Sequence, residues 1–526
     1  MTYTYVIIGA GSAGCVLASR LSEDRDTGVL LLEAGGDDTG RDISIPAAFS
    51  RLFKSKYDWA YLTEPQPELN GRQLDIPRGK VLGGSSAINA MIYIRGHRSD
   101  YELWRELGNT AWGYADVLPY FIKSENRELM SSAYHGSSGP LNVADPRYVN
   151  PLTHAFVAAG MELGLPHNED FNGPKQEGVG YYQVTQKGGR RHSVASAFLK
   201  PVLDRSNLTV VTGAHVTKIL IDKGRAIGVK YQVGGNLHEV EVQGEVILAA
   251  GAIASPQLLM LSGIGPATHL NTLGIEVLHH LPGVGQNLQD HLAIILTYQC
   301  TQPVSLANAE RLSSILRYLL FKKGPLTSNV TEAGAFVRSE DGLRAPDLQV
   351  GFVPAYAHYR GSGRPSGHFF SIGCTYLRPR SRGCIQLRSV DAGDPPLIQP
   401  AFLSDEADLK GLVDGFKLCR LLIEASPFDP YRGEELYPRI EVQSDDEIVE
   451  FIRAYSQTVD HPVGTSKMGV DRMAVVDPRL RVRGIEGLRV VDASIMPTVI
   501  GGNTNAPVIM IAEKAAEFIK GEGAGS

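Results

Sequence analysis

The sequence predicts an α/β fold in which a parallel sheet with helices precedes a part built on antiparallel strands. The first observation is a strand–helix–strand pattern at the start of the chain, formed by the segments Tyr3–Ile8, Cys15–Leu21 and Val29–Leu32. The second is the alternation of side chains in the short segments Phe369–Ile372 and Gly383–Leu387, which is typical of antiparallel strands. The chain has 526 residues, more than one hydrophobic core usually supports, so we expect two or three domains.

A glycine-rich turn separates the first strand from the first helix. Gly9, Gly11 and Gly14 form the pattern GxGxxG. Gly9 would permit the tight turn, Gly11 the approach of a pyrophosphate to the backbone, and Gly14 the close packing of helix on strand. The helix N-terminus, with Ser12 and Ala13, would offer unpaired N–H groups and a partial positive charge to the phosphates.

The second strand ends in an acid. Glu33, followed by Ala34, lies 19 residues after Gly14. Its carboxylate can accept hydrogen bonds from both hydroxyls of an adenosine ribose, and it disfavours a 2′-phosphate. This unit therefore predicts binding of NAD or FAD rather than NADP. An ordinary strand–turn–helix would not require three glycines and an acid in this register.

Composition excludes several other functions. The formal net charge is −6 and the basic residues form no cluster, so nothing indicates a nucleic-acid partner. Five cysteines are scattered and make no CxxC pair, so neither a disulfide framework nor a metal site is predicted. A cytoplasmic location fits this pattern best.

One segment has the length of a membrane span, because residues 246–265 carry no charge. Pro256 and several small residues interrupt its apolar character. We predict a buried parallel strand at 246–250, a turn at 251–255 and a helix at 256–261 with the proline in its first turn. No transmembrane segment or signal peptide is expected, and peripheral membrane association stays open.

A second glycine-rich segment, PRGKVLGGSSAINAM, occupies residues 77–91. Its backbone amides and hydroxyls suit a phosphate or the edge of a flat heteroaromatic ring. A flexible polar loop is the alternative, but beside a dinucleotide fold the segment predicts a second cofactor-contacting loop. Its candidate contact residues are Arg78, Val81, Gly83, Gly84, Ser85, Asn89, Ala90 and Met91.

The third signal lies near the C-terminus and begins with the segment His461–Gly469. A strand at Leu488–Val491 follows, and Asp492 and Ala493 stand at its carboxyl end, where open α/β sheets bind ligands. The sequence GGNTNAP at 501–507 then precedes a helix that runs to about Ile519, with Asn505 as a good N-cap.

Together these three signals resemble the glucose–methanol–choline (GMC) oxidoreductases, flavoenzymes that oxidise alcohols. The resemblance covers nearly the whole chain and includes the segments Asp170–Arg191, Gly251–Gly265 and His461–Lys514. The motifs are most similar to those of bacterial alcohol dehydrogenases that act on aliphatic or aromatic primary alcohols. The resemblance implies FAD. Relatives that tether the flavin carry a histidine at about Ile88, and none occurs between Ser85 and Arg95, so we expect non-covalent FAD.

The resemblance also implies a domain plan. A Rossmann-like FAD-binding domain would comprise residues 1–300 and be completed by residues 461–526, which carry the catalytic residues. Residues 301–460 would form a substrate-binding domain with an antiparallel sheet flanked by helices. Within it, 306–323 and 352–363 are candidate lid or pocket segments, although a packing helix and a plain surface loop would explain them equally well.

The resemblance places His461 and Asn503 at the family's two catalytic positions. Histidine suits removal of the hydroxyl proton because its ordinary pKa is about 6.5, and the asparagine amide can orient the alcohol oxygen. The α-hydride would pass to flavin N5. The remaining implied cofactor contacts are Val216 at the adenine, Asp492 near the pyrophosphate and ribityl chain, Ala250, Gly251, Ala493, Asn503 and Thr504.

Some alternatives stay open. Glu332 aligns roughly with an acid that binds trimethylammonium in some relatives, but relatives that handle neutral alcohols also carry an acid there. A choline substrate is therefore a second possibility, and a lyase or photodecarboxylase of the same fold is a third. The sequence does not decide whether oxygen or a quinone accepts the electrons from the small-molecule alcohol.

Overall fold

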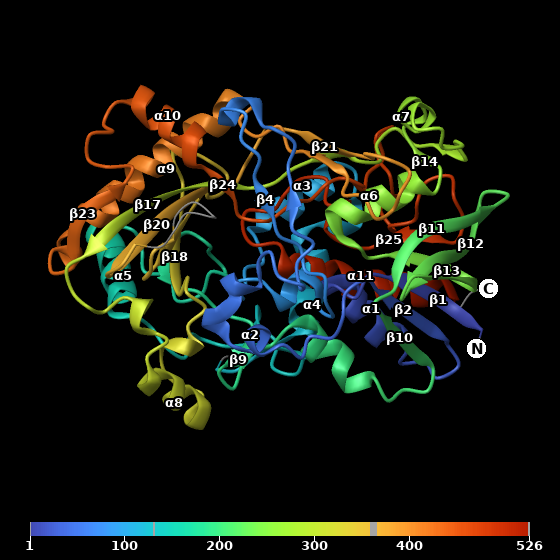
Figure 1. Cartoon of the computed structure of the whole chain (residues 1–526), viewed down its shortest axis with the longest axis horizontal. Coiled ribbons are helices and arrows are strands. Elements are labelled where there is room, and N and C mark those ends of the chain that lie inside the picture. Colours follow the sequence, from blue (N-terminus) through green and yellow to red (C-terminus); the bar gives the residue numbers. More distant parts are fainter. Residues whose placement is uncertain (1, 130–131, 358–364, 524–526) are drawn as a thin grey trace.

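The computed structural model describes residues 2–129, 132–357 and 365–523. Two seven-stranded sheets lie at opposite ends of an elongated molecule (Figure 1), and both termini lie at the end that holds the first sheet. Each sheet has its own large hydrophobic core, one built around β1 and β2 and the other around β17 and β20. The mixed helix and sheet architecture expected from the sequence is confirmed.

The first sheet has a parallel centre and an antiparallel extension. The parallel strands, in spatial order, are β10 (Leu208–Thr212), β2 (Val29–Glu33), β1 (Tyr3–Ile8), β13 (Asn236–Leu248) and β25 (Leu488–Val490). The first half of β13 also pairs antiparallel with β12 (Arg225–Val233), which pairs with β11 (His215–Asp222). Because β25 pairs in register beside β13, the C-terminal segment completes the sheet that the N-terminus begins.

The second sheet is antiparallel throughout. Its strands, in spatial order, are β23 (Arg432–Tyr437), β17 (Leu292–Cys300), β20 (Phe369–Tyr376), β19 (Leu348–Val353), β18 (Ala333–Val337) and β7 (Gly178–Tyr181), with β24 (Gln457–Thr458) also paired to β17. Both β7 and β17 precede residue 301, so this sheet takes strands from the part predicted as 1–300. The division of the chain at residues 300 and 460 stays a prediction.

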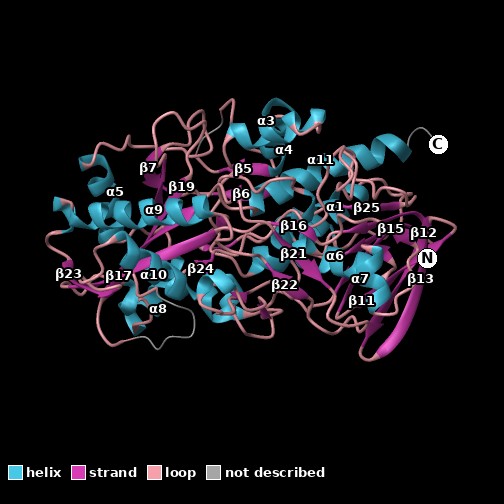
Figure 2. Cartoon of the chain, turned by 90° about the horizontal axis from the view of Figure 1, so that it is seen from above, coloured by secondary structure: helices cyan, strands magenta, loops and turns pink. Residues whose placement is uncertain are grey.

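Helices cover each sheet (Figure 2). In the first half, α1 (Ser12–Leu21) packs against α11 (Asn505–Gly523), and α4 (Tyr114–Ser124) packs on α11. In the second half, α9 (Glu406–Glu424) lies on β20, with α5 (Pro151–Glu162) and α10 (Asp445–Tyr455) beside it. The remaining helices are α2 (Arg41–Ser44), α3 (Arg98–Glu106), α6 (Gly251–Leu261), α7 (Ala267–Thr272) and α8 (Leu312–Phe321).

Short strands and 3₁₀ turns connect these elements. The short strands are β3 (Tyr61–Leu62), β4 (Asp75–Ile76), β5 (Glu125–Arg127), β6 (Leu141–Val143), β8 (Gln186–Lys187), β9 (Arg190–Arg191), β14 (Ile264–Gly265), β15 (His279–His280), β16 (Gln286–Leu288), β21 (Gly383–Gln386) and β22 (Leu397–Gln399). Within the ranges given above, none of the helices combines the length and the apolar character needed to cross a bilayer.

The uncharged segment 246–265 differs from its prediction in one respect. The strand is present, but α6 begins directly at Gly251, so the predicted turn at 251–255 is wrong and Pro256 lies inside the helix. A proline there cannot donate to the carbonyl of Ala252, four residues earlier. The hydroxyl of Thr465 donates to that carbonyl instead, at 2.5 Å, and this distant contact allows the helix to continue through the proline.

Candidate active site

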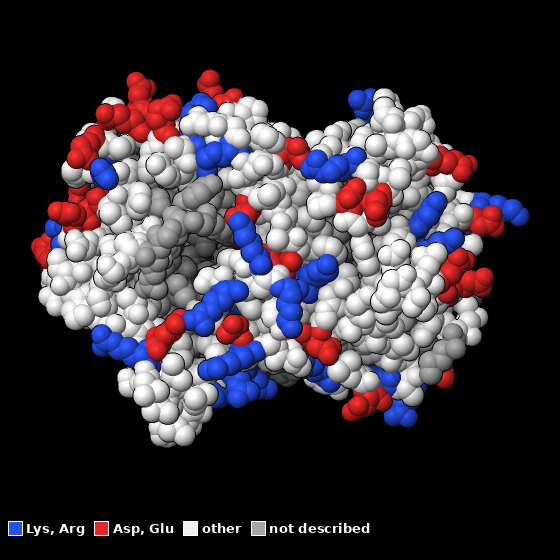
Figure 3. Space-filling model, in the orientation of Figure 1, with Lys and Arg blue, Asp and Glu red and all other residues white. Residues whose placement is uncertain are grey.

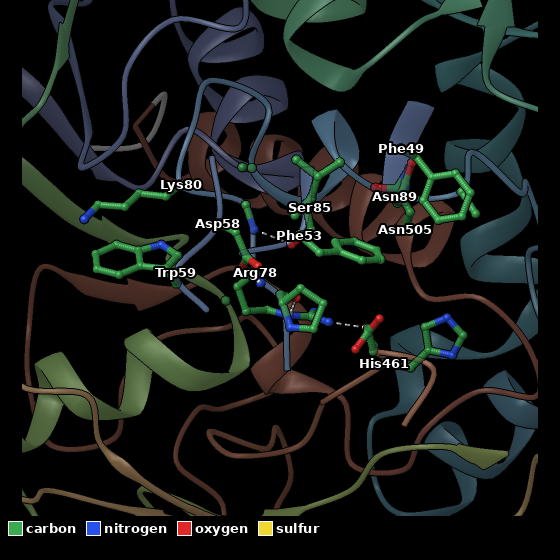
Figure 4. Close-up of a pocket in the computed structure, with 18 of the residues that line it drawn as sticks. Phe49, Phe53, Asp58, Trp59, Arg78, Lys80, Ser85, Asn89, His461 and Asn505 are labelled. Carbon is green, nitrogen blue, oxygen red and sulfur yellow. Dashed lines mark hydrogen bonds between the residues drawn. The ribbon is translucent and has the colours of Figure 1, made fainter. Parts of the chain in front are cut away.

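A cavity of about 1350 Å³ runs from the carboxyl ends of β1 and β2 to the inner face of the second sheet. It exceeds the roughly 300–1,000 Å³ that small-molecule sites usually have, which leaves room for a dinucleotide and a substrate. Figure 4 shows Trp59 and Lys80 on one side of the cavity and His461 on the other, with Arg78 and Ser85 between them.

Two of the three glycines in the first turn are required by packing. Gly9 has φ of +97°, and a Cβ there would lie 2.7 Å from the carbonyl oxygen of Ala249. A Cβ at Gly14 would lie 1.8 Å from the carbonyl oxygen of Gly9, so only glycine lets α1 approach β1 this closely. At Gly11 the nearest atom would be 4.0 Å away, and this residue lines the cavity. Its missing side chain therefore leaves room for a ligand.

The acid at the end of β2 is buried against this turn. The Glu33 carboxylate accepts hydrogen bonds from the backbone N–H groups of Ala10 and Gly35, both at 2.8 Å. Burial raises the pKa of Glu33 to about 7, although these two donors oppose the shift. Glu33 and Ala34 both line the cavity, so the carboxylate can also accept from a bound hydroxyl.

The 77–91 loop is attached to the glycine turn. The N–H of Gly83 donates to the carbonyl of Ala10 at 2.8 Å, and the next residues form a single 3₁₀ turn, Gly84–Ala87. A hydrogen bond fixes the Asn89 side chain, because its oxygen accepts from the Arg191 guanidinium at 2.7 Å. The loop therefore presents its backbone to the cavity from a fixed position.

Asp492 joins the C-terminal segment to the start of α6. Its carboxylate accepts from the N–H of Gly251 at 2.9 Å and from the hydroxyl of Ser255 at 2.6 Å. Burial raises the pKa of Asp492, which these hydrogen bonds oppose. The helix N-terminus at Gly251 is thus held at the cavity wall beside β25.

Most predicted cofactor residues line this cavity. Those that do so are Gly9, Gly11, Ser12, Ala13, Glu33, Ala34, Arg78, Gly84, Ser85, Asn89, Ala90, Met91, Val216, Ala250, Gly251, Asp492, Ala493, Asn503 and Thr504. Gly14, Val81 and Gly83 are not among the lining residues. Gly14 and Gly83 have the structural contacts given above, and Val81 belongs to a small buried cluster with Leu52 and Ile88.

The two predicted catalytic residues meet at the cavity wall. The side-chain amide nitrogen of Asn503 lies 3.1 Å from Nε2 of His461. The side-chain oxygen Oδ1 of Asn503 accepts from the side-chain amide of Gln349 at 3.3 Å, and Gln349 also donates to the Tyr182 hydroxyl at 3.0 Å. Gln349 therefore fixes the orientation in which the Asn503 NH₂ group faces His461.

A second histidine, His291, is hydrogen-bonded to His461. Nδ1 of His291 lies 3.0 Å from Nδ1 of His461, and Nε2 of His291 lies 3.2 Å from the carbonyl oxygen of Leu377. A carbonyl only accepts, so His291 carries its proton on Nε2 and leaves Nδ1 bare. His461 must then donate from Nδ1. This hydrogen-bond network assigns an unprotonated Nε2 to His461, on the side that faces Asn503.

Both imidazoles are neutral in this environment. Burial, and after it the positive charge of Arg78, lowers the pKa of His461 to about 3. Burial, followed by the neighbouring His461, also lowers the pKa of His291. Neutral rings at ordinary pH keep the bare Nε2 of His461 available as a proton acceptor.

The sequence reasoning missed His291, Gln349 and Trp59. His291 is 170 positions from His461, and no local spacing pointed to their contact. Trp59 lines the cavity with its ring centroid 5.8 Å from that of His215, and the Lys80 ammonium lies 4.4 Å from its ring. A tryptophan outside any motif offered no signal.

Glu332 does not line the cavity, although Val330 and Thr331 before it do. Its carboxylate accepts from the N–H of Asn150 and the hydroxyl of Thr153, each at 2.7 Å, and from the hydroxyl of Ser328. Burial raises the pKa of Glu332, which is fully buried and is not a lining residue. Asn150 and Thr153 lie at the start of α5, so Glu332 fixes the start of this helix, which indicates a structural role.

Both candidate lid segments contribute to the wall where the structure describes them. Leu306, Ala309, Glu310 and Ile315 line the cavity from the first, and Val353, Ala355, Tyr356 and Ala357 line it from the second. Residues 358–363 of the second segment lie outside the described residues.

Comparisons with known proteins agree across the whole chain. The family described as GMC oxidoreductase matches at residues 3–293 with its N-terminal model and at residues 379–512 with its C-terminal model. An alcohol dehydrogenase (acceptor) of Pseudomonas putida is 48% identical, over 98% of this chain and 95% of its own length. An oxygen-dependent choline dehydrogenase of Brucella ovis is 46% identical, over 99% of this chain and 96% of its own.

Solved structures show the same fold. A pyridoxine 4-oxidase from Mesorbium loti has a TM-score of 0.91 and 35% identity, and covers 98% of this chain and 99% of its own. A fungal aryl-alcohol oxidase has a TM-score of 0.88 and 25% identity, and covers 99% of each chain.

Proposed function

The chain belongs to the GMC oxidoreductase family, whose members bind FAD, and from this premise we propose that it oxidises an apolar primary alcohol to the aldehyde. The observation that carries the proposal is the bare Nε2 of His461 beside the Asn503 amide, at the wall of a cavity that begins at the glycine turn.

The residues present fit a non-covalent FAD. The open space at Gly11 and the start of α1 suit a pyrophosphate, and the Glu33 carboxylate suits ribose hydroxyls. Ile88, at the position where tethering relatives carry a histidine, is a buried apolar side chain packed with Leu52. FAD would supply the acceptor for the hydride.

The chain's own residues supply the proton transfer. The substrate hydroxyl would donate to Nε2 of His461, while Asn503 donates to the substrate oxygen and sets its direction. Once His461 takes the proton, its Nδ1–H still has His291 Nδ1 as an acceptor, so the imidazolium keeps a hydrogen bond in a buried site. Gln349 keeps the asparagine from rotating.

The substrate part of the cavity favours an uncharged alcohol. The side chains that β17, β19 and β20 contribute to the wall are all uncharged: Ala293, Ile295, Gln349, Gly351, Val353, Ser371, Gly373 and Thr375. None of these strands supplies a carboxylate for a trimethylammonium group, and Glu332 is engaged elsewhere. Primary aliphatic or aromatic alcohols are therefore the proposed substrates, and choline is the second candidate.

The test is anaerobic reduction of the purified holoenzyme in the dark. We expect octanol and benzyl alcohol to bleach the flavin, and choline to do so much more slowly. Bleaching by choline alone would favour the second candidate. Absence of bleaching by every alcohol, with turnover only of a carboxylate in light, would favour a photodecarboxylase. Reoxidation by oxygen and by a soluble quinone in parallel identifies the acceptor.

A further inference from the structure

Helix α8 carries an apolar face that none of the described parts of the chain covers. Leu312, Leu316, Leu319 and Leu320 follow a spacing of four, three and one residues, which places them on one side of the helix, and Phe321 ends it. Their exposed fractions are 72%, 48%, 52%, 71% and 65%. In Figure 1 this helix projects from the lower left of the molecule.

The opposite face of α8 is part of the protein interior. Tyr318 is buried in a small cluster with Ile45, Ala48 and Leu326, and Ile315 packs against the same cluster. Ile315 also lines the cavity. The inner face therefore anchors the helix, and core packing does not account for the apolar residues on the outer face.

The stretch of chain that contains α8 carries charge of a single sign. From Arg311 to Thr331 the chain holds Arg311, Arg317, Lys322 and Lys323 and no acidic residue. Glu310, the nearest acid before this stretch, pairs with Arg51. Figure 3 shows the projecting tip as uncharged atoms, with Lys and Arg side chains and some acidic atoms between it and the middle of this face.

We propose that α8 docks the protein on an anionic lipid bilayer. Leucines along the outer face, an exposed phenylalanine at the end of the helix, and cationic residues before, within and after it are typical of a helix that lies in the interface and inserts its apolar side among acyl chains. The cations would contact phosphate headgroups. This proposal needs no particular reaction, so it goes beyond the function proposed above.

A second copy of the chain fits this face less well. Ten residues of helix are about 15 Å long and, with side chains, about 10 Å wide. A stable protein interface usually buries about 800 Å² on each partner, several times the footprint of this helix. Two copies would also bring their arginine and lysine flanks together, whereas an anionic surface neutralises them.

Docking would place the cavity beside the membrane. The exposed leucines of α8 would contact the bilayer, while Ile315 of the same helix lines the cavity. Apolar alcohols concentrate in bilayers, and lipid-soluble quinones reside there. This consequence alone rests on the proposed function.

The test is co-sedimentation of the holoenzyme with vesicles. Vesicles of phosphatidylcholine with about one-third phosphatidylglycerol should bind the protein at least about tenfold better than pure phosphatidylcholine, and high salt should weaken binding. The triple variant Leu316→Gln, Leu320→Gln, Phe321→Gln should lose about tenfold or more of this binding. The matched control is Leu237→Gln, Val390→Gln, Ile440→Gln, which removes three exposed apolar side chains (62%, 62% and 64%) outside α8, and it should bind like wild type.

Flavin content and reduction by a soluble alcohol monitor folding and should be equal in all three proteins. A wild type that ignores anionic vesicles, or an α8 variant that binds as tightly as the control, would overturn the proposal. Self-association in sedimentation velocity that only the α8 variant abolishes would overturn it in favour of a second copy. Loss of alcohol reduction in every protein would instead defeat the proposed function and leave the docking result intact.

Discussion

Replacing His291 by phenylalanine tests the assignment of the His461 proton. The variant keeps a buried ring but removes the nitrogen that accepts from Nδ1 of His461 at 3.0 Å. Either the Nδ1–H stays without an acceptor, or the proton moves to Nε2, the atom that has to take the substrate proton. A buried unsatisfied donor costs about 1–3 kcal/mol, which corresponds to a rate lowered about 5- to 150-fold.

The assay is stopped-flow anaerobic flavin reduction at saturating alcohol. We expect the rate constant of reduction to fall in this range, while flavin content and the apparent Kd for the alcohol stay close to wild type. His291→Asn is the matched control, because its side-chain oxygen can take the place of Nδ1 as acceptor, and it should recover most of the rate. A His291→Phe enzyme that is fully loaded with flavin and reduced at the wild-type rate would refute the reasoning.

Three further predictions concern single side chains. His461→Ala should retain its flavin and slow anaerobic reduction by about 10²–10⁴-fold, and unchanged kinetics would remove His461 from the mechanism. Burial raises the pKa of Glu33 to about 7 from an ordinary 4.5, so the Glu33 carboxyl group binds its proton more tightly in the folded apoprotein than in the unfolded chain. The associated stability is fully present below about pH 4.5 and is lost as the pH rises through 7. Glu33→Gln should therefore reduce the fall in apoprotein Tm across that window, and an identical fall in both proteins would count against the assignment. Glu332→Gln should lower the free energy of unfolding by about 1–3 kcal/mol and leave the preference for octanol over choline unchanged, whereas a changed preference would return this acid to the substrate site.

The sequence predicted those parts of the site whose physical reasons are local. A strand, a turn and a helix within 35 residues determine the roles of Gly9 and Gly14, and the geometry shows both packed too tightly for any side chain. The order of the motifs along the chain identified the family, and with it the pairing of His461 with Asn503.

Contacts between distant segments could not be predicted in this way. The proline in α6 was predicted to start the helix, with a turn before it, because nothing near it in sequence shows that Thr465 satisfies the carbonyl of Ala252. β7 is a short strand, GVGY, whose pairing with β18 depends on the second sheet and not on its own side-chain pattern. Nothing in the sequence distinguishes Gln349 from other residues of β19. Its hydrogen bond to Asn503, 154 positions away, is visible only in the fold.

The hydrogen bond between His291 and His461, 170 positions apart, depends on a third buried residue, Asp290. Asp290 accepts from the backbone N–H of His291 and from the backbone N–H of His461, both at 2.8 Å through the same carboxylate oxygen. Its other oxygen accepts from the hydroxyl of Thr458. Burial raises the pKa of Asp290 to about 7, so holding this clamp ionised has a cost that its donors offset. The buried acid fixes the two backbones, the fixed backbones align the two rings, and the aligned rings leave Nε2 of His461 without a proton and facing the Asn503 amide.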